Sequence, residues 1–169
     1  RVNHSTETAV LRTRIDNGEV GVLVLLDLSA AFDTVDHVLL LRVLAQEIGL
    51  GGTALSLFSS YLSDRYQSVV IGEHTSSPLP LTCGVPQGSV LGPVLFVLYT
   101  NSIDQVLKQH DINQHSYADD TEMFKTCKAR EISSALSDLT ACASDVHNWM
   151  DSRMLKLNAD KTERSEERR

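Results

Sequence analysis

Three aspartates are the strongest candidates for chemistry in this sequence. Asp27 directly follows the apolar run 20–26, and Asp119 and Asp120 stand side by side between two apparent strands. Adjacent carboxylates repel each other, so a turn that presents both is unfavourable unless a cation compensates. Carboxylate oxygens suit Mg²⁺, and two such ions roughly 3.5–4 Å apart can clamp an in-line phosphoryl displacement. The residues thus predict a two-metal site if both segments share one sheet. A solvated Asp-Asp turn is the alternative, and spacing alone does not decide between them.

A glycine-rich segment is the second feature that could bind a ligand. Residues 84–89 read Gly-Val-Pro-Gln-Gly-Ser, a dense turn signal that places the amide of Gln87 just before a helix. Glycines allow the backbone to approach a flat or charged ligand closely. The alternative is an ordinary turn with a helix cap at Ser89 or Gly92, followed by Pro93 in the first helical turn.

Hydrophobic periodicity predicts the elements that position these residues. The run 20–28 is typical of a strand covered on both faces. Residues 66–71 and 79–83 indicate a hairpin with a long loop at 72–77, and 115–117 and 122–126 flank the acidic turn. Helices are expected at 6–17, 38–48, 55–62, 93–107 and 132–150, and a short strand near 154–157. This order favours an α+β fold with an antiparallel sheet covered by helices on one face.

Composition narrows the class of protein. The chain has 169 residues, 42% hydrophobic and 22% charged, which fits one folded domain and excludes a disordered chain. No apolar run approaches the ~20 residues of a membrane helix, so no membrane partner is expected. The net charge of −7 argues against a free-standing nucleic-acid binder. The cysteines form no CxxC pair and the histidines no metal-binding pair, so we expect reduced thiols in an intracellular protein, whether nuclear or cytoplasmic.

Four segments together resemble the reverse transcriptases of LINE-type, non-long-terminal-repeat retrotransposons. Residues 25–33 (LLDLSAAFD) resemble motif A of that family, and 84–93 (GVPQGSVLGP) resemble motif B. Residues 117–120 (YADD) resemble motif C, and 155–163 (LKLNADKTE) resemble motif D. Residues 4–9 (HSTETA) are similar to the lead-in from fingers to palm. The resemblance implies a polymerase-type palm.

The resemblance also implies a role for individual residues. Asp27 and Asp119 would hold two Mg²⁺ ions, or Mn²⁺ in their place, with Asp120 supporting the same site. Phe32 would be the steric gate that excludes a ribose 2′-hydroxyl. The remaining implied contacts are the backbone of Leu28, Ser29, Ala30 and Ala31 under the triphosphate, Gln87 and Gly88 at the incoming nucleotide, and Lys161 as proton donor to pyrophosphate.

By this resemblance, residues 1–163 are a partial reverse transcriptase domain, the end of the fingers plus the palm, and 164–169 are a disordered charged tail. The implied partners are an RNA template, a DNA primer and dNTPs. The rest of the fingers and the thumb would belong to a parent polyprotein, so the isolated segment is expected to be inactive. Two alternatives stay open: a catalytically silent retroelement remnant that acts as a folded or binding module, and another two-metal phosphotransferase, which would leave Pro86-Gln87-Gly88 unexplained.

Overall fold

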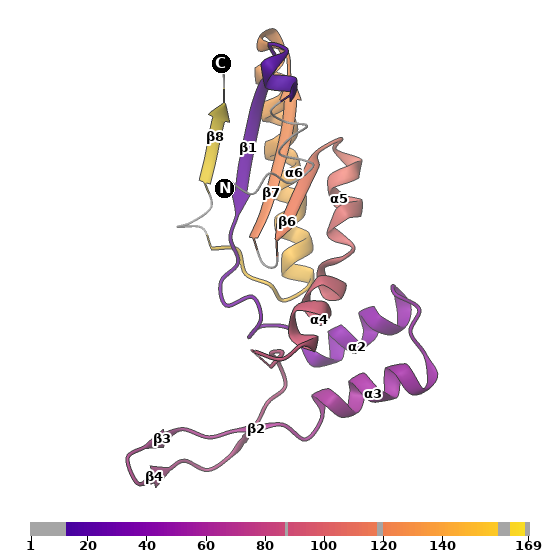
Figure 1. Cartoon of the computed structure of the whole chain (residues 1–169), viewed down its shortest axis with the longest axis vertical. Helices are drawn as coiled ribbons and strands as arrows, with labels where there is room; N and C mark the ends of the chain where they lie inside the picture. Colours follow the sequence, from indigo (N-terminus) through magenta and orange to yellow (C-terminus); the bar gives the residue numbers. More distant parts are fainter. Residues whose placement is uncertain (1–12, 87, 118–119, 159–162, 168–169) are drawn as a thin grey trace. The chain divides into compact units, whose positions relative to one another are not determined.

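The chain forms two compact units, which we describe separately. The computed structural model describes residues 13–86, 88–117, 120–158 and 163–167 (Figure 1). Unit 1 comprises residues 1–29 and 102–169, and unit 2 comprises residues 30–101. The first boundary falls between Ser29 and Ala30, inside the segment that resembles motif A.

Unit 1 is built on one antiparallel sheet. Its strands are β1 (Val20–Leu26), β6 (Asn113–Tyr117), β7 (Asp120–Cys127) and β8 (Glu163–Glu167), in the spatial order β6-β7-β1-β8. All of the paired neighbours run antiparallel. The predicted strands on either side of the acidic turn are therefore confirmed as β6 and β7, and the predicted apolar strand is confirmed as β1.

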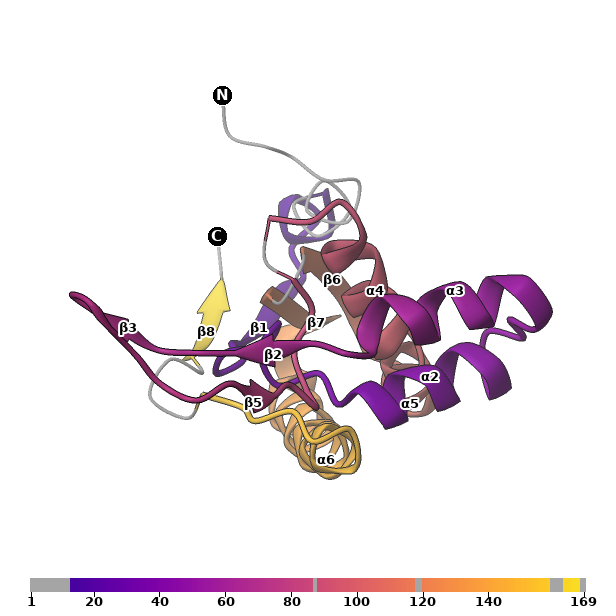
Figure 2. The ribbon, with the colours of Figure 1, turned by 90° about the horizontal axis from the view of Figure 1, so that it is seen from below.

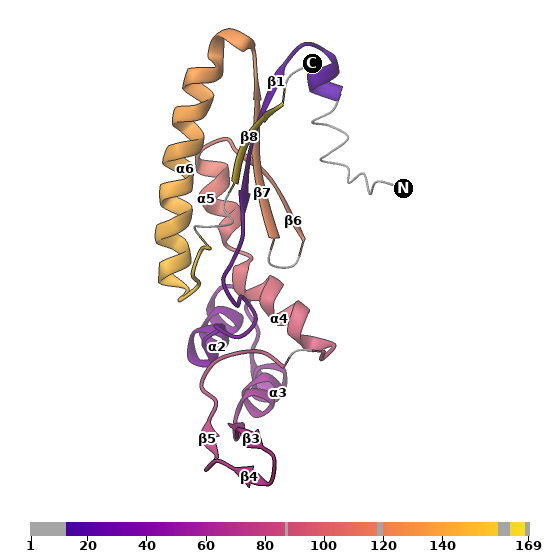
Figure 3. The same ribbon diagram turned by 90° about the vertical axis from the view of Figure 1, so that its left-hand side faces the viewer.

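Helices cover one face of this sheet. Helix α6 (Ile132–Ser152) follows the short 3-10 helix η1 (Ala129–Glu131) and packs on β7 and β1, while α5 (Ile103–Gln109) packs on β6 and α6 (Figures 1 and 3). The buried residues of α6 recur at steps of three and four: Ala135, Leu139, Cys142, Val146 and Met150. This arrangement confirms the predicted α+β architecture.

Burial along β1 alternates between its two faces. Val22, Val24 and Leu26 are buried, whereas Leu23 and Leu25 are half-buried. Successive side chains of a strand point to opposite faces, so the first set lies on the face that carries the helices. Both faces of β1 are thus covered as predicted, the helix-bearing face more completely than the other. Leucine and valine suit a strand whether its second face is fully or half covered.

None of the three cysteines forms a disulfide. Burial raises the pKa of the Cys142 thiol to about 11, and the nearby carboxylate of Asp145 acts in the same direction. Cys83 and Cys127 are half-exposed, whereas Cys142 is fully buried in the α6 stripe. Cys142 is therefore a core residue that stays protonated at neutral pH.

We expect a thiol reagent at pH 8 to modify Cys83 and Cys127 in the folded chain and to leave Cys142 unmodified. A pKa near 11 leaves about one thiolate per thousand at that pH, and burial also blocks access. Mass spectrometry before and after addition of guanidinium chloride checks this expectation. The Cys142→Ser variant identifies the late-reacting site, and modification of all three thiols without denaturant would contradict the assignment.

Unit 2 combines three helices with a hairpin. Helices α2 (His37–Gln46) and α3 (Gly52–Leu62) lie side by side, and α2 also contacts α4 (Leu91–Thr100) (Figure 2). In the hairpin, β2 (Tyr66–Gln67) pairs with β5 (Leu79–Pro80), and β3 (Val70–Ile71) pairs with β4 (His74–Thr75). Pairing therefore extends into the stretch 72–77 that the sequence indicated as a loop. Asp36 caps α2, because its Oδ1 accepts a hydrogen bond from the Leu39 amide at 2.7 Å.

Two further predictions differ from the structure. The helix expected over 93–107 is divided into α4 and α5 at residues 101–102, where the chain passes from unit 2 to unit 1. In unit 1, the Ser102 hydroxyl accepts hydrogen bonds from Arg153 Nη2 at 2.7 Å and Trp149 Nε1 at 3.3 Å. These contacts fix Ser102 to the end of α6, and such tertiary anchors are invisible to helical periodicity.

The charged tail is the second difference. The sequence predicted disorder over 164–169, but residues 163–167 form β8, which pairs with β1 from Leu25↔Glu163 to Gly21↔Glu167. Strand pairing uses backbone groups and needs no apolar face, so the open edge of β1 is sufficient to order a charged segment. No helix in the described ranges is both long and apolar enough to cross a membrane.

Candidate active site

Asp27 lies at the end of β1, next to the strand that carries Asp120. The β1–β7 ladder ends at the pair Leu26 and Thr121, so Asp27 directly follows one member of that last pair and Asp120, the first residue of β7, directly precedes the other. Asp27 is half-buried. The two-metal prediction requires the strands of Asp27 and of the acidic turn to be neighbours in one sheet, and the structure makes them so. Asp119 lies outside the described residues.

The segment after α6 forms a second set of contacts around Asp27. The Ser29 amide donates to the Lys156 carbonyl at 2.8 Å, and the Asn158 amide donates to the Asp27 carbonyl at 2.8 Å. Between these bonds, Leu28 and Leu157 form an antiparallel bridge. The short strand predicted near 154–157 is thus a brief antiparallel pairing of the segment that resembles motif D with residues 27–29 of the segment that resembles motif A.

Asn158 also reaches the carboxylate itself. Its Nδ2 donates a hydrogen bond to Asp27 Oδ2 at 3.0 Å. Main-chain and side-chain bonds from one residue therefore hold both the backbone and the carboxylate of Asp27. No role was predicted for Asn158, although it lies in the segment 155–163 that resembles motif D. The reason is that no local pattern pairs two residues 131 positions apart.

The donor chemistry around Asp27 fits a hard cation. Carboxylate oxygens such as those of Asp27 are the ligand type that Mg²⁺ takes, and a hydrogen bond to a ligating carboxylate fixes its orientation. Within the described residues, no group of three histidine, cysteine, aspartate or glutamate side chains is placed to hold a metal ion. Asp119, the remaining aspartate of the predicted metal site, lies outside that part of the chain.

The turn after Ala30 shapes the part of motif A that belongs to unit 2. Ala30 has a positive φ of 51°, and its carbonyl accepts hydrogen bonds from the amides of Asp33 and Thr34 at 2.9 and 3.2 Å. The Phe32 ring is half-buried and lies 4.9 Å from the Phe96 ring, centroid to centroid. Phe32 is therefore anchored on the α4 core through one side and remains partly accessible.

The glycine-rich loop leads directly into α4. The Ser89 hydroxyl donates to the Pro86 carbonyl at 2.6 Å and accepts from the Gly92 amide at 3.0 Å. The N-cap of α4 is Val90, so Ser89 lies one residue before the cap and Gly92 inside the helix, while Pro93 falls in the first helical turn as predicted. Gly88 is exposed and has a positive φ of 74°, which glycine adopts without strain.

The expected site residues are thus distributed over both units. Asp27, Leu28 and Ser29 belong to unit 1 with Asp120, whereas Ala30, Ala31, Phe32 and Gly88 belong to unit 2. Leu28 and Ala31 are buried, so only their backbone could face a ligand. Gln87 and Lys161, like Asp119, lie outside the described residues, and their roles stay predictions.

Comparisons with known proteins agree on one family. A family model described as reverse transcriptase (RNA-dependent DNA polymerase) matches residues 1–169. The RNA-directed DNA polymerase from mobile element jockey of Drosophila melanogaster is 29% identical over 176 residues, covering 95% of this chain and 18% of the relative. A probable RNA-directed DNA polymerase from transposon X-element of the same organism is 37% identical over 93 residues, covering 55% of this chain and 10% of the relative.

A solved structure shares the fold. Apo telomerase from Candida tropicalis superposes with a TM-score of 0.70 at 16% identity, covering 98% of this chain and 36% of that one. The chain spans less than a fifth of the length of the two polymerase relatives. At this identity, the telomerase match establishes fold alone.

Proposed function

Because the chain belongs to the reverse transcriptase family, we propose that it forms the nucleotidyl-transfer centre of a retrotransposon RNA-directed DNA polymerase. The reaction would extend a DNA primer with dNTPs along an RNA template. The observation that carries this proposal is the pairing of β1 with β7, which brings the strand that Asp27 follows beside the strand that begins with Asp120. Reverse transcriptases normally use divalent metal ions, and the oxygen donors at this sheet end are of the type such ions take.

Asp27, Asp119 and Asp120 would hold two Mg²⁺ ions. When bound, the ions would help the primer 3′-hydroxyl to lose its proton and would neutralise the charge that builds on pyrophosphate. The chain's own contribution is orientation: the register fixes the spacing of the two strands, and Asn158 holds Asp27 Oδ2.

Residues of several segments would supply nucleotide recognition. The backbone of residues 28–31 would pass under the triphosphate, and Phe32 would occupy the space of a ribose 2′-hydroxyl. Gln87 and Gly88 would contact the incoming nucleotide, where the exposed glycine leaves room for a close approach. Lys161 would donate a proton to the leaving pyrophosphate. The described residues on either side of it, Asn158 and Glu163, are bonded to Asp27 and paired with Leu25 respectively.

Primer extension tests the proposed function. We expect a longer protein that includes this chain together with the rest of the polymerase to extend a DNA primer on an RNA template. EDTA should abolish this reaction. The isolated 169-residue chain should show little or no synthesis, since it spans only 18% of the jockey relative. Robust extension by the isolated chain would contradict the second expectation. A folded longer protein that extends no primer under any metal would contradict the first and favour the catalytically silent alternative.

Replacing Asn158 by Leu is expected to weaken Mn²⁺ binding by the chain about tenfold, since loss of a hydrogen bond to a ligating carboxylate typically has an effect of this size. Leucine has a similar size but cannot donate to Asp27 Oδ2. Electron paramagnetic resonance of free Mn²⁺ during a titration measures the affinity without requiring polymerase activity. Asn148→Leu, on the exposed face of α6, is the matched control. Equal affinity in both variants would show that Asn158 does not orient a metal ligand.

A further inference from the structure

The carbonyl of Gly84 is held by two side chains from different elements. His37 Nε2 lies 2.8 Å from this oxygen, and Arg65 Nη1 donates to it at 3.0 Å. A carbonyl oxygen can only accept, so Nε2 of His37 must carry the hydrogen. Two donors occupy both lone pairs of the oxygen, so this carbonyl is saturated by the fold itself.

Each donor is itself fixed in place. His37 is buried and opens α2 directly after the cap Asp36, and its amide donates to the Thr82 carbonyl at 3.2 Å. Arg65 follows α3 and opens the hairpin, and its own carbonyl accepts from the Leu81 amide at 2.8 Å. The two donors therefore reach Gly84 from separate, anchored segments rather than from flexible stems.

The other side of Gly84 is bonded to the motif A turn. The Gly84 amide donates to the Val35 carbonyl at 2.8 Å, and the Val85 amide donates to the Phe32 carbonyl at 2.9 Å. Gly84 has a φ of +85°, and a β-carbon there would lie 3.2 Å from the Asp33 carbonyl oxygen. Glycine is thus the residue type that fits at position 84, between the turn that contains Phe32 and the two donors.

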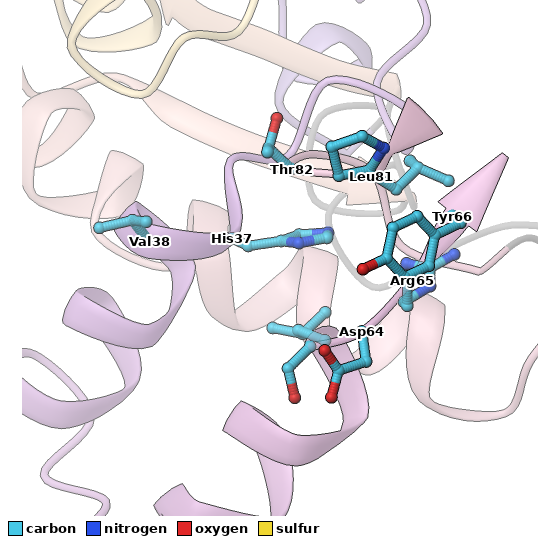
Figure 4. A pocket seen from close by; sticks show the side chains of 10 residues that line it. His37, Val38, Asp64, Arg65, Tyr66, Leu81 and Thr82 are labelled. Carbon is cyan, nitrogen blue, oxygen red and sulfur yellow. The ribbon is translucent and has the colours of Figure 1, made fainter. Parts of the chain in front are cut away.

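A pocket of about 290 Å³ opens beside these donors. Figure 4 shows His37 extending from the start of α2 toward the side where Arg65 and Tyr66 lie, with Asp64 at the rim. The pocket gives solvent access to the Arg65 side chain, which is half-buried. The bond from Arg65 to Gly84 therefore lies next to solvent, whereas the bond from His37 is buried.

We propose that His37 and Arg65 are positioning residues. They hold Gly84, where the 84–89 loop begins, against the turn of residues 30–34, and thereby place Gly88 for the incoming dNTP. We call the two hydrogen bonds from His37 and Arg65 to the Gly84 carbonyl the clamp. The role of the clamp in dNTP binding rests on the proposed function, whereas the clamp itself does not. Neither side chain touches the nucleotide in this scheme. Both act through the Gly84 carbonyl, so their loss should loosen the loop without altering Asp27.

Hydrogen exchange in the 169-residue chain tests the clamp independently of activity. In His37→Leu and Arg65→Met, we expect the amides of Gly84 and Val85 to exchange at least about tenfold faster, as for loss of one buried hydrogen bond. Amides of α6 should be unchanged. His37→Gln and Arg65→Lys keep a donor and should restore most of the protection. His147→Leu and Arg130→Met remove the same side-chain types from exposed positions and serve as controls.

Nucleotide kinetics in the longer, active protein tests the positioning role. We expect the two donor-less variants to raise the KM for dNTP about tenfold with a smaller change in kcat, and the conservative variants to recover it. A purely structural role would lower the active fraction, hence kcat, and leave KM unchanged. Unchanged exchange at Gly84 and Val85, or loosened exchange with an unchanged KM, would overturn the inference. A wild-type protein without any polymerase activity would instead count against the proposed function, and exchange alone would then decide the clamp.

Discussion

Replacing Asp27 by Asn is expected to lower RNA-templated primer extension by about a thousandfold, equivalent to about 4 kcal/mol of transition-state stabilisation. The change removes one negative charge from the sheet end where Asp27 and Asp120 are neighbours, and with it a hard ligand for the metal ions. The amide oxygen of asparagine can still accept the hydrogen bond from Asn158 Nδ2. The loss should therefore fall on kcat, with a melting temperature close to that of the wild type.

The control for this prediction is Asp151→Asn. Asp151 lies near the end of α6 with its side chain 65% exposed, and the substitution changes the net charge by the same amount. Single-turnover extension by both variants, with circular dichroism melts, separates a catalytic loss from an unfolding effect. Activity within tenfold of wild type in a folded Asp27→Asn protein would remove Asp27 from the catalytic centre and with it the two-metal proposal.

The second large effect is expected at Phe32. Its ring would exclude ribonucleotides by a clash with the 2′-hydroxyl, so Phe32→Val should reduce the ratio of kcat/KM for dNTP over rNTP by about 10–100-fold. The same change removes the ring contact with Phe96, at a cost of about 1–2 kcal/mol of folding free energy. Both effects are expected together, because the half-buried ring has one anchored side and one accessible side.

Phe96→Leu separates the two effects. Phe96 is buried in α4, so its replacement should lower the melting temperature through lost packing while Phe32 keeps its ring at the turn. We expect the nucleotide ratio to be unchanged in this variant. A Phe32→Val protein that folds and retains the wild-type ratio would show that Phe32 is only a core residue.

The sequence predicted the parts of the fold that leave a local pattern. The apolar run of β1, the buried stripe of α6 and Pro93 in the first turn of α4 could be predicted, because each depends on residues within a few positions of one another. The family resemblance rested on short strings and is confirmed by a match over residues 1–169. The two-metal prediction required the strand that precedes Asp27 and the strand that begins with Asp120 to be neighbours, and β1 and β7 are neighbours in the sheet.

Long-range hydrogen bonds could not be predicted in the same way. No role was predicted for Asn158, His37 or Arg65, and the histidines were considered only as metal ligands. Each gains its contact through tertiary structure: Asn158 bonds a residue 131 positions away, and His37 one 47 positions away. The available signal was a histidine at the start of a helix rich in apolar residues, because a polar ring that is buried there needs a hydrogen-bond partner.

The position of β8 bears on how the chain avoids self-association. β8 is the outermost strand next to β1, whose seven residues are valine, leucine and glycine without a charge or a proline. Such a segment with an unpaired edge is a template for further strands and for aggregation. The sequence of β8, Glu-Arg-Ser-Glu-Glu, replaces that edge with one rich in like charges, which repel an incoming strand. A chain cut before Glu163 would therefore expose the apolar edge of β1, which is prone to aggregation. The charged segment thus protects the apolar strand that Asp27 follows.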